Sequence, residues 1–463
     1  MKTILILLTI GCITLNGQMQ NKDGWKNADK ILKNIVPPSF PDKVFNLESY
    51  GSSEELSKNI KPALDKAIDE CSKAGGGTVV ILRGEYNCNG PIHLKSNVNL
   101  HLEDGAVVKF STNPSDYLPV VFTRWEGIEC YNYSALIYAR NQENIAITGN
   151  GSFDGQGSNQ NWWAWSGSQR FGWSAGKSSQ RESRPKLTEM NNKEVPVEKR
   201  IFGNDNYLRP NFLQLINCKN ILIEGITLLN SPMWFVHPLL SENITIKNIK
   251  TIGKGPNNDG IDPESCKGVL IDACYFDNGD DCIAIKSGRN ADGRRINIPS
   301  ENIIVRNSEM KDGHGGVSIG SEISGGCRNV YIENCTMDSP NLDRALRIKS
   351  NSYRGGVVEN IYMRDVKVGE VSNAVVRMNM RYDPREGSDG KFTPAFRNIN
   401  VERVTSRKSE YALELIGLEN SPIQNVSITD CSFNGVDDGN SIEYTENLKL
   451  KNVKINGKLV DKD

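Results

Sequence analysis

A twelve-residue segment in which apolar and polar residues alternate recurs along the chain, usually with Asn and a β-branched residue near its start. Its copies are KNILIEGITLLN (219–230), ENITIKNIKTIG (242–253), KGVLIDACYFDN (267–278), ENIIVRNSEMKD (301–312), RNVYIENCTMDS (328–339), ENIYMRDVKVGE (359–370), RNINVERVTSRK (397–408) and QNVSITDCSFNG (424–435). A period of two is typical of a β-strand with one buried face. The repeat therefore predicts a strand in each copy.

The spacing of the copies indicates how these strands are arranged. Counted from the second residue of each copy, the steps are 23, 25, 34, 27, 31, 38 and 27 residues. A short minimum with variable additions is typical of a β-solenoid, whose coils have similar strands and whose insertions form loops. Leucine-rich repeats are the alternative, but their leucine pattern is missing, and no helical pattern supports βαβ units. We predict an all-β fold, a right-handed parallel β-helix.

The chain before the repeats predicts a covered end. In IKPALDKAIDECSKAGGG (60–77), apolar residues recur at helical spacing and three glycines end the pattern. An amphipathic capping helix there would close the open end of the solenoid. We expect an N-terminal extension over residues 18–42 and the β-helix over residues 43–463. Residues of about 156–210 lack the repeat and are rich in tryptophan, so we expect an insertion folded over one face.

The first residues, MKTILILLTIGCITLNGQ, form an apolar run that ends in small and polar residues. This pattern is typical of a secretory signal peptide, assigned to residues 1–17, and is too short to span a membrane. A lipid anchor at Cys12 is the alternative, which Thr9, three positions earlier, disfavours. We expect an exported protein, periplasmic or extracellular, without a membrane span.

Composition narrows the function further. The 463 residues include 55 basic and 56 acidic ones, a net charge of -1, which argues against a nucleic-acid partner.

Eleven cysteines in an exported protein could form disulfides. Six of them instead fall at two repeated positions, which predicts ladders of reduced, buried cysteines without a metal motif. These six are Cys218, Cys266, Cys327, Cys274, Cys335 and Cys431.

Carboxylates cluster at coil spacing in the middle of the chain. PNNDGIDPESC (256–266) contains Asp259 and Asp262, and DNGDDCIAIKSG (277–288) contains Asp280 and Asp281, 21 and 22 residues after Asp259. This separation matches one minimal coil, and coils stack about 4.8 Å apart. Asp259, Asp280 and Asp281 are therefore expected to meet on one face, with Asp262 in a structural role.

Three further residues extend this cluster. DGHGGVSIGSE (312–322) places His314 between glycines, and RALRIKS (344–350) places Arg347 and Lys349 on the same side of a strand. Each feature alone is explained by turn residues or a solvated face. Their joint occurrence at coil-compatible spacing favours a catalytic site.

NND, GDD, GHG and RIK, in this order, resemble the signatures of glycoside hydrolase family 28, the polygalacturonases and related pectin hydrolases. The similarity extends from NLESYGSS near residue 46 to the C-terminal repeats, and includes GGGTVVI, DGQG, RPNFLQLINCKN and SPMW. The first family signature is usually Asn-Thr-Asp. Here Asn258 stands in its middle, a change that keeps the carboxylate of Asp259.

The resemblance implies a role for each clustered residue. Asp280 would be the general acid, Asp259 and Asp281 would hold and deprotonate the attacking water, and His314 would tune the acid. Three acids in one cleft cannot all ionise easily, so we expect Asp280 to keep its proton. The family inverts configuration, although adjacent coils predict carboxylates nearer than the roughly 6.5–9.5 Å usual for inverting enzymes.

The resemblance also implies substrate contacts. Arg347 and Lys349 would bind a galacturonate carboxylate, and Asn257 is a further substrate-binding candidate. Tyr382, in MRYDP (380–384), is expected two coils past the basic pair, either contacting sugar or packed at the base of a loop. Trp125 and Trp163 are either stacking surfaces for sugar rings or buried anchors.

The predicted function is hydrolysis of α-1,4-galacturonosidic bonds in pectic polysaccharide or oligogalacturonides, without a cofactor. An exo mode is favoured because the insertion could block one end of the cleft. Rhamnogalacturonan hydrolysis is an alternative within the family, although that branch tends to lack the GHG signature. A calcium-dependent pectate lyase would place its acids differently, and a non-catalytic carbohydrate-binding β-helix would not need every signature.

Overall fold

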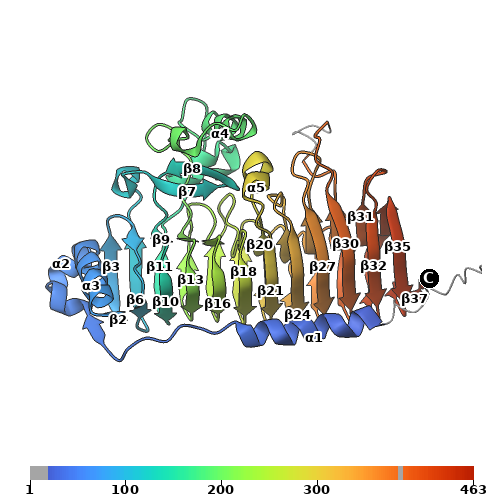
Figure 1. Ribbon diagram of the computed structural model, residues 1–463, viewed down its shortest axis with the longest axis horizontal. Helices are drawn as coiled ribbons and strands as arrows, with labels where there is room; N and C mark the ends of the chain where they lie inside the picture. Colours follow the sequence, from blue (N-terminus) through green and yellow to red (C-terminus); the bar gives the residue numbers. More distant parts are fainter. Residues whose placement is uncertain (1–18, 384–388, 463) are drawn as a thin grey trace, which may run out of the picture.

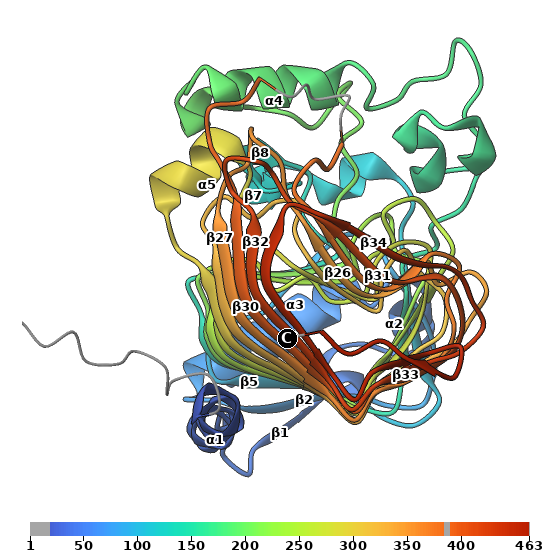
Figure 2. The same ribbon diagram turned by 90° about the vertical axis from the view of Figure 1, so that its right-hand side faces the viewer.

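The computed structural model describes residues 19–383 and 389–462, and their strands stack into a solenoid with three faces (Figures 1 and 2). The first face is a parallel sheet of thirteen strands. In stacking order they are β1 (Val44–Asn46), β2 (Gly77–Ile81), β5 (Val98–Leu102), β10 (Glu143–Gly149), β13 (Lys219–Glu224), β16 (Glu242–Lys247), β18 (Lys267–Asp272), β21 (Ser300–Arg306), β24 (Cys327–Glu333), β27 (Val357–Arg364), β30 (Ala395–Glu402), β32 (Ile423–Thr429) and β35 (Thr445–Lys451).

The second face carries shorter strands that are also parallel, except the last. They are β3 (Gly84–Cys88), β6 (Ala106–Phe110), β11 (Ser152–Asp154), β14 (Thr227–Leu229), β17 (Lys250–Gly253), β19 (Tyr275–Asn278), β22 (Glu309–Met310), β25 (Thr336–Met337), β28 (Lys367–Glu370), the start of β31 (Thr405–Ile416), β33 (Ser432–Phe433), β36 (Lys454–Ile455) and the antiparallel β37 (Lys458–Leu459). Their inward side chains join the continuous apolar core of the solenoid.

The third face carries the candidate site. Its strands are β4 (Ile92–His93), β9 (Ile137–Arg140), β12 (Leu213–Ile216), β15 (Val236–Leu239), β20 (Ile283–Ile285), β23 (Val317–Ile319), β26 (Arg344–Lys349), β29 (Ala374–Asn379), the end of β31 and β34 (Val436–Glu443). Ile261 bridges β15 to β20 and keeps the register between them. The predicted parallel β-helix, with an N-terminal helix, is confirmed.

The Asn near the start of each repeat has two structural tasks. Asn220, Asn243 and their equivalents have a φ near +55°, a left-handed conformation that Asn tolerates better than most residues. Their side-chain amides donate to the Asn of the preceding coil, at 2.9 Å for Asn220 to Asn144 and 2.7 Å for Asn243 to Asn220. Gly268 takes this position in one coil, again at positive φ. The repeat is thus both a turn signal and a hydrogen-bonded ladder.

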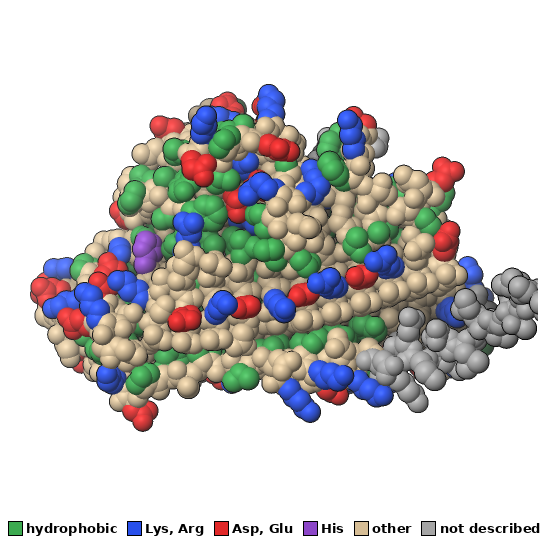
Figure 3. Space-filling model, in the orientation of Figure 1, with side chains coloured by type: hydrophobic (Ala, Val, Ile, Leu, Met, Phe, Trp, Pro, Cys, Tyr) green, Lys and Arg blue, Asp and Glu red, His purple; other side chains and the backbone are tan. Residues whose placement is uncertain are grey.

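Charged residues just before these asparagines form a second ladder, which we call the charge ladder (Figure 3). The strand register aligns acid and base alternately over eight strands of the first sheet. Glu301, for example, lies 3.4 Å from Lys267 and 2.6 Å from Arg328. The ladder comprises Glu143, Lys219, Glu242, Lys267, Glu301, Arg328, Glu359 and Arg397.

The cysteines lie inside the solenoid. All those described are free and buried, including the six aligned by the sequence repeat. Serines complete the columns, because the Cys218 amide donates to Ser241 Oγ and the Cys266 amide to Ser300 Oγ. Burial raises the pKa of Cys266 to about 12, so its thiol stays protonated. The prediction of reduced core cysteines is confirmed.

Helices cover the start and one side of the solenoid. Helix α3 (Lys61–Lys73) follows α2 (Ser53–Lys58) and buries Leu64, Ile68 and Cys71 against the first coils. Helix α1 (Met19–Asn34) runs along the outside of the first sheet (Figure 1). There the Trp25 ring packs edge-on against Tyr331, with 5.5 Å between ring centroids. Cys12 and the predicted signal segment lie outside the described residues.

The non-repeating segment lies over the first half of the third face (Figure 1). It contains α4 (Ser183–Asn192) and the 3-10 helices η3 (Trp162–Ser166), η4 (Gln169–Phe171) and η5 (Val197–Lys199), and packs with the hairpin of β7 (Val121–Trp125) and β8 (Ile128–Asn132). Helix α5 (Asn290–Ile296) lies beside them, and η1 (Leu47–Tyr50) and η2 (Pro114–Tyr117) occur earlier. Within the described part of the chain, no helix is long and apolar enough to cross a bilayer.

Candidate active site

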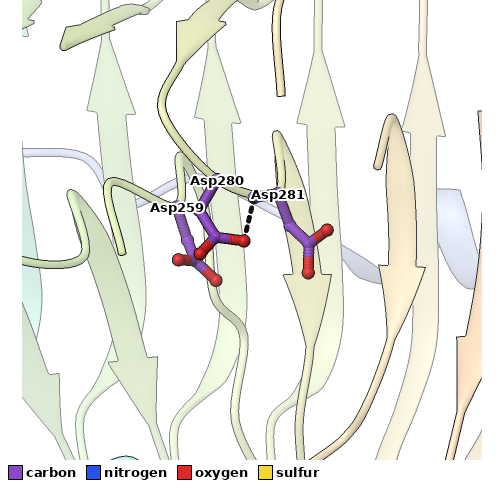
Figure 4. Close-up of side chains that lie close together, drawn as sticks. All are labelled: Asp259, Asp280 and Asp281. Carbon is purple, nitrogen blue, oxygen red and sulfur yellow. Dashed lines mark hydrogen bonds between the residues drawn. The ribbon is translucent and has the colours of Figure 1, made fainter. Parts of the chain in front are cut away.

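Three carboxylates meet on the third face (Figure 4). One oxygen from each of Asp259, Asp280 and Asp281 lies within 4.8 Å of the other two. Asp281 donates its backbone N–H to Asp280 Oδ1 at 2.9 Å, which fixes these neighbouring side chains. Asp259 and Asp281 are buried, whereas Asp280 is partly exposed. The meeting of these carboxylates, predicted from the 21- and 22-residue spacing, is present in the structure.

Asn258 anchors the loop that carries Asp259 to the preceding coil. This side chain is fully buried, accepts the Gly255 amide, and donates to the carbonyls of Ser231 and Met233, each at 2.9 Å. The residue that departs from the usual family signature thus anchors the loop. Asn257 has a φ of +53° and accepts a hydrogen bond from Arg209 Nη2 at 2.7 Å.

His314 contacts the outermost carboxylate. Its Nδ1 lies 2.9 Å from Asp280 Oδ1, and about half of its side chain is exposed. Asp280 raises the pKa of His314 above its ordinary value. Burial alone would raise the pKa of Asp280, but His314 holds it below the usual carboxyl range. In the unliganded site the imidazole therefore binds a proton in preference to Asp280.

The basic pair lies on the opposite side of the cluster. Arg347 Nη1 donates to Asp281 Oδ1 at 3.2 Å and Lys349 Nζ to Asp281 Oδ2 at 2.7 Å. Burial would raise the pKa of Asp281, but Lys349 and Arg347 hold it far below the usual range. Asp281 is therefore ionised at neutral pH, and both bases already have an anionic partner before substrate arrives.

Tyr382 lies closer to the basic pair than its predicted position two coils away. Its ring centroid is 5.6 Å from the Arg347 guanidinium and 5.4 Å from Lys349 Nζ. Strand β26 pairs directly with β29, so Tyr382, just after β29, is only one coil past the pair. The predicted distance was wrong because a loop lengthens the sequence between these strands.

The sequence suggested that charge crowding keeps a proton on Asp280. In the structure the crowding raises the pKa of other carboxyl groups instead. Burial and then the neighbouring Asp262 raise the pKa of Asp259 well above the usual range. Burial also raises the pKa of Asp262, to about 8, against the opposing effect of Lys286. The crowding was predicted correctly, but its main consequence falls on the buried pair of Asp259 and Asp262, because Asp280 has His314 as a partner.

The sequence reasoning missed the residue beneath these acids, Lys286. Its Nζ lies 3.4 Å from Asp259, 3.3 Å from Asp262 and 3.5 Å from Glu322, and 4.4 Å from the centroid of the Trp234 ring. Lys286 immediately follows the apolar strand β20, and a lysine that continues a buried strand was the available signal. The direction of the Lys286 side chain depends on the pairing of its backbone with Glu264 on the preceding coil.

The β7–β8 hairpin forms a wall beside the site. At its tip, Glu126 accepts from Arg184 at 2.8 Å and Arg289 at 3.1 Å. Gly127 packs so closely that an added Cβ would lie 2.9 Å from Glu322 Cγ. The hairpin also contacts the coils before the site, where Thr123 donates to Gln214 at 2.7 Å. His314 and the basic pair lie on the following coils.

The two tryptophans of interest have different surroundings. Trp125, in the hairpin, is buried and donates its indole N–H to the Arg209 carbonyl at 3.0 Å. Trp163 is partly exposed and donates to the Ser231 carbonyl at 2.9 Å. Trp125 is therefore an anchor of the wall.

The clustered carboxylates are close enough to ligate a cation. Lysine and arginine side chains supply positive charge instead, because Lys349 and Arg347 contact Asp281 and Lys286 contacts Asp259. We therefore assign these acids no role as metal ligands.

Comparisons with known proteins agree with this geometry. The family model for glycosyl hydrolases family 28 matches residues 198–456. A solved structure, a hyperthermoactive exopolygalacturonase from Thermotoga maritima, is 45% identical with a TM-score of 0.90, covering 94% of this chain and 96% of that one. A "Probable polygalacturonase" of Vitis vinifera is 30% identical over 82% of this chain and 72% of its own length. An exo-poly-alpha-D-galacturonosidase of Dickeya chrysanthemi is 25% identical over 95% of this chain and 78% of its own.

Proposed function

Because the chain belongs to the glycosyl hydrolases of family 28, we propose that it hydrolyses the α-1,4 bonds between galacturonate residues of polygalacturonate, from a chain end. The observation that carries this proposal is the cluster of three carboxylate oxygens within 4.8 Å of one another. His314 lies on one side of this cluster and the basic pair on the other. The signal-like first residues further support export to the medium or periplasm, where the enzyme would encounter pectic polysaccharide.

The proposed reaction begins with the proton that His314 binds beside Asp280. The proton passes from the His314 imidazolium to Asp280 and from Asp280 to the glycosidic oxygen as the bond to the anomeric carbon breaks, and His314 regains a proton from solvent before the next cycle. A water held between Asp259 and Asp281 attacks the anomeric carbon from the opposite side. Its proton passes to Asp259, while Asp281 remains ionised and orients the water. The configuration at the anomeric carbon is inverted.

An acidic substrate fits the basic side of the site. Among the described residues, the Arg347 guanidinium makes one hydrogen bond, from Nη1 to Asp281. A guanidinium carries five N–H donors. Its other donors can meet a galacturonate carboxylate as a fork. Lys349, which is more deeply buried, neutralises Asp281. Tyr382 offers its ring beside the same sugar.

An exo mode is supported by the wall before the site. The β7–β8 hairpin and the insertion cover the coils that precede β20, down to the contact of Gly127 with Glu322. A polysaccharide can therefore extend from the carboxylates only over the following coils, past Arg347. The relatives from Thermotoga maritima and Dickeya chrysanthemi, both named as exo-acting, support the same mode.

The test is a product profile on polygalacturonate, with proton NMR of the first anomer released. We expect small products from the first minutes and a β-anomer, because an α-bond is cleaved with inversion. A ladder of oligomers would contradict the exo mode. Equal hydrolysis of a fully methyl-esterified chain would contradict recognition of an acidic sugar.

A further inference from the structure

Next to Asp259, the carboxylate that we propose to deprotonate water, lies a buried group of charges that the family signatures do not include. Lys286 is 3% exposed, yet its ammonium lies within 3.5 Å of three carboxylates, those of Asp259, Asp262 and Glu322. Asp262 is completely buried. One ammonium cannot neutralise three buried carboxylates, so at least one of them must bind a proton or meet another cation.

Glu322 meets those other cations. Burial would raise its pKa, but Lys286 and then Arg354 and Arg289 hold it far below the usual range. The shortage of positive charge therefore falls on Asp259 and Asp262. Both oxygens of Asp262 and Oδ1 of Asp259 are buried without a hydrogen-bond donor among the described residues. A proton between the two carboxyl groups would give one oxygen of each a hydrogen bond, since only a protonated carboxyl can donate.

We propose that Lys286 and Asp262 are positioning residues for Asp259: the two carboxyl groups share one proton above the Lys286 ammonium, so Asp259 can ionise toward the site while Asp262 keeps the proton. The proposal deepens the hydrolase function proposed above and rests on Asp259 as the base. It resolves a conflict in that mechanism, because Asp259 cannot accept a proton from water while it carries one.

The surrounding charges fix the expected direction of each change. Lys286 favours ionised Asp259, and Asp262 opposes it. Several elements present charged or titratable groups to this unit. They are Asp280 and Asp281 before β20, Glu264 and His237 on the preceding coils, Arg124 and Glu126 of the hairpin, Arg209, Arg289 before α5, Glu322 after β23, Lys349 on β26, and Arg354.

The first experiment compares pH profiles of kcat/KM on polygalacturonate. Lys286→Met should raise the pH of the acidic limb by roughly one unit or more and lower kcat about 100-fold, because Asp259 stays protonated. Lys286→Arg should keep the wild-type limb. Asp262→Asn preserves the neutral form of Asp262, so Asp259 should still ionise and the variant should keep the wild-type limb. Lys254→Met, a lysine that pairs with Asp277 and Asp312, is the matched control and should move nothing.

A second readout needs no substrate, and so separates this proposal from the proposed function. Without Lys286, the buried carboxyl groups have folded pKa values above their unfolded ones, and the stability they contribute is lost as pH rises through the folded values. The drop in Tm of Lys286→Met relative to wild type should therefore widen between pH 5 and pH 8. A pH-independent drop, or an acidic limb unmoved by Lys286→Met, would overturn the proposal.

Should Lys286→Met fail to fold, the isosteric Asp262→Asn decides the question. Its Tm should fall less than that of the wild type between pH 5 and pH 8, because the proton that the pair shares is no longer there to be lost, and an equal fall refutes the shared proton. If the wild type cleaves no polygalacturonate, the proposed function fails, and the Tm comparison alone then decides on the charge unit.

Discussion

Charges are aligned along this solenoid in two places, on the first sheet and on the third face, and they are balanced differently. In the charge ladder every base faces an acid on the neighbouring coil, as Lys219 and Glu242 do at 2.5 Å, and both side chains remain about half exposed. On the third face, Lys286 lies among three carboxylates and is buried. The same stacking that neutralises charge on one face concentrates it on the other.

This difference separates two uses of one geometry. Exposed and alternating charges cost little and contribute at most about 1 kcal/mol each. Buried carboxylates in excess of cations are expensive, and their neighbours set the direction of their pKa shifts. Burial and Asp262 raise the pKa of Asp259, whereas Lys349 and Arg347 lower that of Asp281 against the effect of burial. Carboxyl groups with separated pKa values are what acid and base catalysis require. The solenoid thus accepts a local cost at its catalytic coils.

Among substitutions on the third face, Asp280→Asn is expected to reduce activity most. We expect kcat on polygalacturonate to fall by roughly 10²–10⁴-fold, the usual contribution of a general acid. Fluorescence titration with oligogalacturonide should find substrate binding retained. Near-normal turnover would show that Asp280 is not the acid.

The next largest effect is expected from Arg347→Gln. Losing a charge-assisted hydrogen bond of about 1.5–3 kcal/mol should raise KM for polygalacturonate roughly ten- to hundredfold. Arg328→Gln, in the charge ladder, is the matched control and should leave KM unchanged. An unaltered KM in Arg347→Gln would exclude this guanidinium as the carboxylate-binding group.

His314→Gln should change the pH dependence more than the maximal rate. Asp280 raises the pKa of His314, so the wild-type alkaline limb of kcat/KM should lie above the ordinary histidine value of about 6.5. Without the imidazole the proton rests on a carboxyl group alone, and the limb should move to lower pH. Pair stability follows the same sign: present at low pH, it is lost as pH rises through the raised pKa of His314. An alkaline limb that stays in place would contradict proton supply by His314.

The smallest effect is expected in the charge ladder itself. Glu301→Gln removes the acid between Lys267 and Arg328 and should lower the free energy of unfolding by about 1 kcal/mol or less. Urea denaturation at low and high salt would measure it, and the loss should shrink as salt screens the pair. Any loss of activity in this variant would contradict the separation of the two faces.

The sequence predicted the solenoid because its local signals agree with the fold. Each coil repeats a period of two after an Asn that the left-handed turn favours, as at Asn220 and Asn243. The spacing of Asp259, Asp280 and Asp281 then followed from the coil length. These features depend on short-range geometry, which a sequence displays directly.

Features that depend on long-range register were harder to predict. Tyr382 was placed one coil too far because a loop lengthens the sequence between β26 and β29, which pair directly. Lys286 was missed because its orientation toward Asp262 follows from pairing with a preceding coil. The site of the retained proton depends on how burial and charge compete at each carboxyl group, and residue spacing alone contains neither quantity.

The charge ladder also bears on how this solenoid could have grown. Its signs alternate from strand to strand, so the electrostatic repeat is two coils although the structural repeat is one. Duplicating a single coil, such as the one that carries Glu242, would bring two like charges into direct opposition, which destabilises a sheet. Duplicating a pair of coils keeps an acid opposite a base at every step of the ladder. The ladder therefore favours gain or loss of coils in twos, and an engineer who lengthens this molecule should insert them in the same way.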